Sequence, residues 1–171
     1  MREILGVHDD PESVFTFSRI RIWGVLIFCF IVINEITVDW LLAITIGGYG
    51  FEASFEHIFR YSSPFAYFES APFRLIPYLL LTSLAAFLGD YYSVHEKMAF
   101  WGALIAIALF HFWGYWGLNY PSYNGERLSS TAALALLFIP LHAIWVGLLA
   151  GIVTGLLSLL SASIFKKIRG V

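Results

Sequence analysis

Apolar residues fill the chain in long blocks that short charged clusters separate. Residues 98–125 form a run of 28 without Asp, Glu, Lys or Arg, and residues 128–165 form a run of 38. Two shorter apolar blocks begin near residues 22 and 75. Because about 20 predominantly apolar residues are enough to cross a bilayer as a helix, this pattern predicts membrane-spanning helices rather than the elements of a soluble domain.

We expect an all-α polytopic membrane protein whose four transmembrane helices form a single membrane domain over residues 1–171. The first helix has an unclear end because Asn34 interrupts it, and the second is short because it begins only after Arg74. Pro77 would lie in the first turn of the second helix, where its missing N–H costs no hydrogen bond. The predicted spans cover about residues 19–38, 75–92, 98–118 and 131–160, and a cytoplasmic tail runs to 171.

The amino-acid composition excludes several classes of protein. Apolar residues make up 59% of the chain and charged residues 13%, against about 25% charged residues in soluble domains. These values exclude a soluble globular enzyme and a disordered chain. The single cysteine, Cys29, excludes an internal disulfide and a CxxC redox pair. The net charge of −2 gives no reason to expect a nucleic acid partner.

Lysine and arginine residues predict the orientation of the spans. Seven of the ten lie in the N-terminal segment, in the loop between the second and third spans, and in the tail. The other three, Arg60, Arg74 and Arg127, lie in the two alternate loops. Because cytoplasmic loops carry an excess of basic residues, we expect both termini on the cytoplasmic side of a cytoplasmic (inner) membrane.

The fourth span carries small residues at every fourth position: Ala143, Gly147, Gly151 and Gly155. This spacing places them on nearly one helical face, where another helix can approach closely. The partner helix could belong to a second copy of the chain, which would give a homo-oligomer. It could equally belong to another span of the same chain. We favour the contact between copies.

The loop between the first two spans, residues 39–74, is predicted to be an outward amphipathic and aromatic segment. Phe51, Phe55, Ile58 and Phe59 follow the spacing of an apolar stripe on a short helix. We favour an interfacial helix that lies on the bilayer or caps the bundle. The alternative is a docking surface for a protein partner, which could also bind at the cytoplasmic face.

Glu35 and Asp39 are the acidic residues nearest the interior of the first span. Counted from Arg21, Glu35 lies about 21 Å along a helix, within a hydrocarbon core about 30 Å thick. Intramembrane acids are costly and mark ion or proton sites. The alternative, which we favour for Glu35, is that the first span ends near Asn34.

His111 and His142 fall in adjacent spans, and two histidines on facing helices could ligate a haem iron. No carboxylate is evident near them to orient the rings, as metal-bound histidines require. We therefore expect hydrogen-bonded packing roles for both, and neither a metal nor another cofactor.

The leading functional hypothesis is a small non-enzymatic membrane protein that assembles through helix packing as a sensor, immunity or accessory subunit. Its four-span plan resembles that of small immunity proteins and of membrane subunits of bacterial defence systems in architecture, and architecture alone does not give function. The alternatives are a transporter or pore-forming subunit with Glu35 and Asp39 in a polar path, and a haem-binding or other membrane enzyme.

Overall fold

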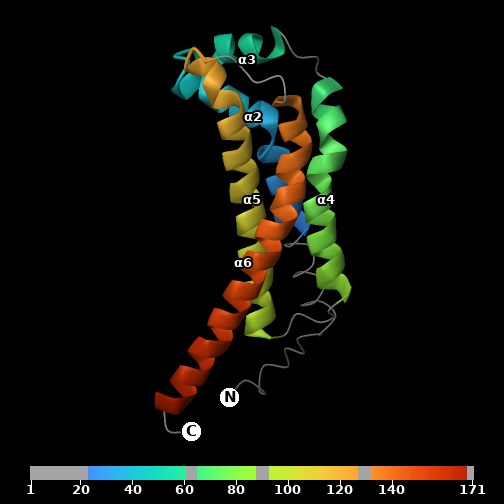
Figure 1. Cartoon of the computed structure of the whole chain (residues 1–171), viewed down its shortest axis with the longest axis vertical. Coiled ribbons are helices and arrows are strands. Elements are labelled where there is room, and N and C mark those ends of the chain that lie inside the picture. Colours follow the sequence, from blue (N-terminus) through green and yellow to red (C-terminus); the bar gives the residue numbers. More distant parts are fainter. Residues whose placement is uncertain (1–22, 61–64, 88–92, 127–131, 169–171) are drawn as a thin grey trace, which may run out of the picture.

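The computed structural model describes residues 23–60, 65–87, 93–126 and 132–168, and within these ranges the chain is helical and contains no strand. Figure 1 shows the three longest helices along the long axis of the molecule, with α6 between α5 and α4 and with α3 across one end. The helices in chain order are a first segment Trp23–Val32, α2 Glu35–Thr45, α3 Phe51–Arg60, α4 Phe65–Phe87, α5 Val94–Tyr123 and α6 Ala132–Ile168.

The first predicted span is broken in two. The segments Trp23–Val32 and Glu35–Thr45 meet at an angle of 54°. Asn34 caps the start of α2 with extended backbone angles (φ −142°, ψ 168°), and its Oδ1 accepts the Thr37 N–H at 2.9 Å. Its Nδ2 donates to the carbonyl of Ile31 at 2.8 Å. One side chain thus satisfies backbone groups on both sides of the break, which allows a break inside an apolar bundle.

The predicted loop over residues 39–74 is largely helical, so its boundaries were wrong. Helix α2 continues to Thr45, and α4 begins at Phe65, ten residues before the predicted start of the second span. Pro77 therefore lies inside α4 rather than in its first turn, and Pro72 also lies inside this helix. The prediction failed because Arg74 was taken as the edge of the membrane, whereas its charge is buried in the bundle.

Helices α5 and α6 extend beyond their predicted ends and form the most extensive contact in the bundle. Helix α5 begins after Ser93, whose Oγ accepts the Glu96 N–H, and ends at Tyr123. Asn124 caps this end of the helix, and Gly125 follows it with a positive φ of 78°. Pro121 lies in the last turn of α5.

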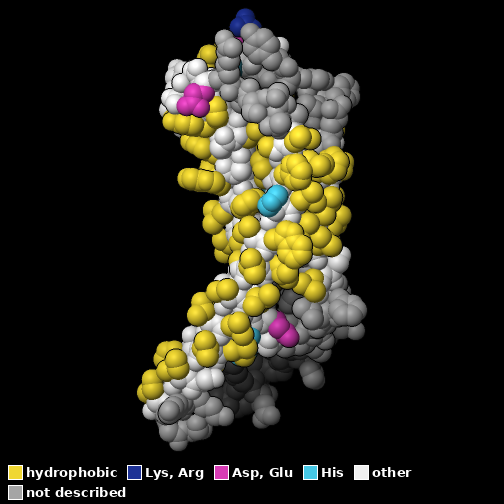
Figure 2. Space-filling view, viewed as in Figure 1, with side chains coloured by type: hydrophobic (Ala, Val, Ile, Leu, Met, Phe, Trp, Pro, Cys, Tyr) yellow, Lys and Arg dark blue, Asp and Glu magenta, His cyan; other side chains and the backbone are white. Residues whose placement is uncertain are grey.

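Two helices, Val94–Tyr123 and the Leu134–Phe165 part of α6, are long and apolar enough to cross a membrane, and the bent pair before them is a third if it counts as one span. Figure 2 shows hydrophobic side chains over most of the visible described surface, with few charged side chains among them. This distribution is typical of a membrane protein, because a helix apolar on all sides requires an apolar surrounding.

Candidate functional site

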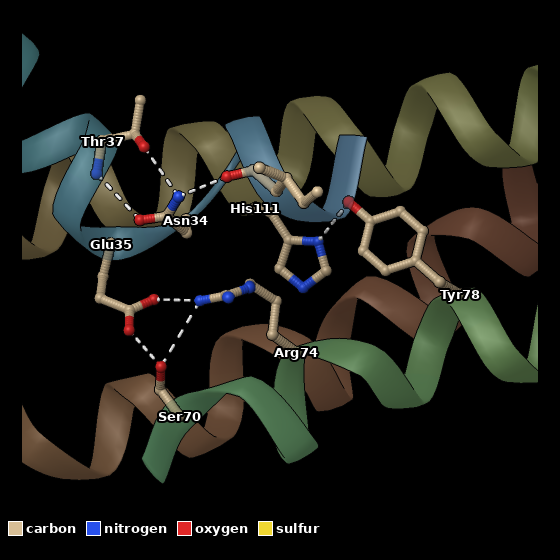
Figure 3. A network of polar contacts seen from close by, with 8 residues as sticks. Asn34, Glu35, Thr37, Ser70, Arg74, Tyr78 and His111 are labelled. Atoms are coloured by element: carbon tan, nitrogen blue, oxygen red, sulfur yellow. Dashed lines mark hydrogen bonds and ion pairs between the residues drawn. The ribbon is translucent and has the colours of Figure 1, made fainter. Parts of the chain in front are cut away.

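A buried ion pair joins the broken first span to α4. The guanidinium Nη1 of Arg74 lies 2.7 Å from the carboxylate Oε2 of Glu35. The Arg74 side chain is 0% exposed and that of Glu35 is 13% exposed. Ser70 donates its hydroxyl to Glu35 Oε1 and accepts from Arg74 Nη1 at 3.4 Å. Figure 3 shows Arg74 reaching from α4 to Glu35, with Ser70 between them and the ribbon of α4.

The local sequence explains why these groups meet. Ser70, Arg74 and Tyr78 are spaced by four residues, so they lie on one face of α4. Glu35 is the first residue of α2, directly after the Asn34 cap. A negative charge is favoured at this position by the free N–H groups and the dipole of the helix. The break at Asn34 therefore places Glu35 at a helix start that faces α4.

Aromatic rings enclose the ion pair on its other side. The guanidinium carbon of Arg74 lies 4.8 Å from the ring centre of Phe30, a cation–π contact. Tyr78 shares a hydrogen bond of 3.4 Å with His111 Nδ1, and their rings are stacked. His111 also stacks on Tyr115, with ring centres 5.8 Å apart. The polar site thus connects the first span, α4 and α5 across the centre of the bundle.

Burial makes this site sensitive to the loss of either charge. Moving two charges out of water is costly, and their mutual attraction offsets that cost only while both are present. Removing one partner of a buried pair typically costs about 3–5 kcal/mol. The site can therefore hold α2 and α4 together, and its free-energy contribution depends on the integrity of the pair.

Asp39 belongs to a different contact. Its carboxylate Oδ1 accepts the hydroxyl of Tyr123 at 2.9 Å, which ties α2 to the end of α5. Glu35 and Asp39 thus face different helices in the described structure and have different partners. The polar path through both acids stays a prediction.

The two histidines have different surroundings. His111 is fully buried against Tyr78, whereas His142 is exposed on α6 and bonds through Nδ1 to the carbonyl of Phe138 at 2.8 Å. The Nε2 atom of His111 is buried and lacks a hydrogen-bond partner within the described residues. Those residues contain no group of three His, Cys, Asp or Glu side chains that could hold a metal ion. The expectation that no haem or metal binds stays a prediction.

Helix α3 is the short helix that the aromatic stripe predicted. Ile58 is buried against the bundle, while Phe51, Phe55 and Phe59 are each more than 40% exposed. The rings of Phe51 and Phe55 also contact Trp40 of α2, with centres 5.1 and 5.3 Å apart. The stripe therefore has one side on the bundle and one side open. Its position at a membrane interface, and the alternative of a docking surface, stay predictions.

The small-residue face of α6 packs against α5 of the same chain. A Cβ atom added to Gly147 would lie 2.6 Å from Ile107, and one added to Gly151 would lie 3.1 Å from the carbonyl of Ala99. Gly155 also faces Ala99, and Ala143 is fully buried. Helix α5 thus contacts this face within the chain. The favoured interpretation, a contact between copies through the same face, stays a prediction.

A groove of about 460 Å³ lies between α4, α5 and α6. Gly147, Gly151 and Gly155 belong to its lining. Pro77 and Ile107 line its inner end, one residue from Tyr78 and one helical turn from His111. Helix α4 is therefore a wall of the groove and also carries half of the ion pair.

Sequence reasoning missed Ser70, Arg74 and Tyr78. Arg74 was treated as a charge of the outer loop, and the other two were not considered. The spacing of polar residues at 70, 74, 78 and 82 in an otherwise apolar segment was the available signal. Comparisons of the chain with protein-family models, with curated proteins and with solved structures found no match.

Proposed function

We propose that the protein is a non-enzymatic sensor, immunity or accessory subunit of a cytoplasmic membrane. The observation that supports this most is the buried Glu35–Arg74 pair. In this proposal α2 and α4 have two arrangements, joined through the pair and separated, and the pair favours the joined one. Such an element suits a protein that responds to a partner or to the membrane by changing its arrangement.

In this proposal the chain has four spans and both termini are cytoplasmic. Helix α4, with 23 residues, is about 35 Å long, enough for a core of about 30 Å. Its internal charge is neutralised by Glu35. Without Arg74, the outward loops keep only Arg60 and Arg127 against seven basic residues on the other side. Reporter fusions at Val171 and Ser63 should give opposite sidedness, and the same sidedness would refute the topology.

The test of the function is whether the ion pair controls the position of α4. Spin labels at Leu79 on α4 and Leu149 on α6, both exposed, would report the distance between the helices after Cys29 is replaced by Ala. We expect one narrow distance in the parent protein and a longer, broader distribution after Glu35→Gln. Asp39→Asn is the matched control, because Asp39 contacts α5 and not α4. Equal distributions in all three proteins would contradict the proposal.

Transport is the second candidate, and the break at Asn34 favours it. Discontinuous membrane helices in transporters present half-helix ends to the transported ion or substrate, and Glu35 lies at such an end. In liposomes, this function predicts a cation or proton flux that Glu35→Gln abolishes. A flux that is absent from the parent protein, or that survives Glu35→Gln, would contradict this candidate.

A further inference from the structure

A buried ionisable ring, that of His111, lies next to the ion pair. His111 is 0% exposed, and its ring is stacked on Tyr78 and on Tyr115. Figure 3 shows the ring between the hydroxyl of Tyr78 and the side chain of Arg74. We propose that His111 makes the Glu35–Arg74 contact sensitive to acid, so that a proton on its ring favours the separated arrangement of α2 and α4. This inference rests on the proposed function, because it names the signal to which the pair responds.

The hydrogen bonds around His111 fit a neutral ring better than a protonated one. A neutral imidazole carries one N–H and one lone pair, whereas a protonated imidazole carries two N–H groups. Nδ1 shares a hydrogen bond with the hydroxyl of Tyr78, and Nε2 is buried without a partner among the residues that the structure describes. A protonated ring would therefore hold two buried N–H groups with one partner between them, and a buried donor without an acceptor is costly.

The charge of Arg74 acts in the same direction. Arg74 and Tyr78 are one helical turn apart on α4, so the stretch of helix that contacts the His111 ring also carries the guanidinium. The charge of Arg74 acts on His111. Because little water screens two charges in an apolar bundle, a proton on His111 would be repelled strongly by this cation. The carboxylate of Glu35 is already paired with Arg74.

The neighbouring ionisable groups supply no other negative charge. Among the described residues, those that interact with His111 or with the two tyrosines stacked on it are Cys29 of the first segment, Glu35 of α2, Arg74 and Tyr78 of α4, and Tyr115 of α5. Phenol and thiol groups are neutral below about pH 7, which leaves the cation and its paired carboxylate.

Movement of α4 would remove this obstacle to protonation. Arg74 and Tyr78 both belong to α4, so a shift of this helix takes the cation away from His111 and opens the ring to water. The separated arrangement therefore binds the proton more tightly than the joined one. By linkage, acid shifts the equilibrium toward the separated arrangement, and neutral conditions favour the joined one.

A titration of the distance between α4 and α6 tests this inference. The full chain, with Cys29 replaced by Ala and spin labels at Leu79 and Leu149, would be reconstituted in liposomes. Distances would be measured from about pH 8 to about pH 4, a range that includes the protonation of histidine and glutamate side chains. We expect one narrow distance at the upper end and a longer, broader distribution toward the lower end. Because one proton is taken up, the ratio of separated to joined molecules should rise by at most about tenfold for each pH unit.

His111→Phe is the deciding variant, because its ring can still stack on the two tyrosines but cannot gain a proton. It should keep the narrow distance across the whole range. His111→Gln, which retains hydrogen-bonding groups, provides the same test if His111→Phe does not fold. His142→Gln is the matched control, since His142 is exposed on α6 and bonds to the carbonyl of Phe138. This control should respond to acid as the parent protein does.

Two outcomes would overturn the inference. If acid leaves the parent distances unchanged while Glu35→Gln lengthens them, the proposed function stands and His111 is not its sensor. If both His111 variants keep the acid response, the proton is taken up by Glu35 or another group. Distances in Glu35→Gln that equal those of the parent protein at the upper end of the range would instead contradict the proposed function, on which the inference rests.

Discussion

Helices α5 and α6 meet through small residues, whereas α4 is joined to the first span through buried charges. The first contact relies on shape alone, with glycine faces that let two backbones approach each other. The second relies on two groups that are each unfavourable in an apolar surrounding unless the other is present. The α5–α6 pair is therefore expected to be permanent, and the α4 contact to be the part that can change.

The largest effect is expected from removing the buried cation. Arg74→Met leaves Glu35 buried without its ion-pair partner and should lower the free energy of unfolding by about 3–5 kcal/mol, measured by denaturation in mixed micelles. The double variant Glu35→Met with Arg74→Met removes both charges and should regain most of this loss. If the double variant is as unstable as the single one, the contact owes its stability to packing and not to charge.

An intermediate effect is expected at the α5–α6 contact. Gly151→Leu would force a side chain against Ala99 and Ala103, and overpacking of this kind costs about 1–3 kcal/mol. Because the contact lies within one chain, the variant should lose stability without a change in oligomeric state. Gly117→Ala is the control, since an added Cβ there meets nothing within 4 Å. A Gly151→Leu protein that stays stable but forms smaller oligomers would mean that the face also contacts another copy.

The smallest effect is expected at the Asp39 contact. Tyr123→Phe removes a hydrogen bond to a carboxylate, which contributes about 1.5–3 kcal/mol when it is buried and less here because both residues are only partly buried. Tyr120→Phe, at an exposed position of the same helix, should have no effect on the unfolding free energy. Equal stability of the two variants would show that Asp39 does not hold α2 to α5.

The features that the sequence predicted correctly depend on local periodicity. The stripe at Phe51, Phe55 and Ile58 predicted α3 because residues on one face of a helix recur within one or two turns. The small-residue face of α6 was predicted to contact a helix for the same reason. Which helix it contacts depends on the tertiary arrangement, and periodicity within α6 carries no information about that.

The ion pair was not predicted because its partners are 39 residues apart. Each charge seen alone indicated the end of a span, so Glu35 and Arg74 were both assigned to membrane boundaries. Only when α2 and α4 are placed side by side does each charge explain how the other is tolerated. The sequence does indicate a polar interruption at Asn34. An asparagine can end one helix or cap the start of the next, and the sequence alone does not distinguish these two roles.

The apolar part of α6 has one further physical consequence. Leu134–Phe165 contains 32 residues, about 48 Å of helix, while average transmembrane helices tilt by only about 20° across a core of about 30 Å. Figure 1 shows the C-terminal end of α6 extending past the start of α5. This hydrophobic mismatch is accommodated by stronger tilt or by local thickening of the bilayer. The length of this one helix should then determine whether the protein partitions into thin or thick bilayers.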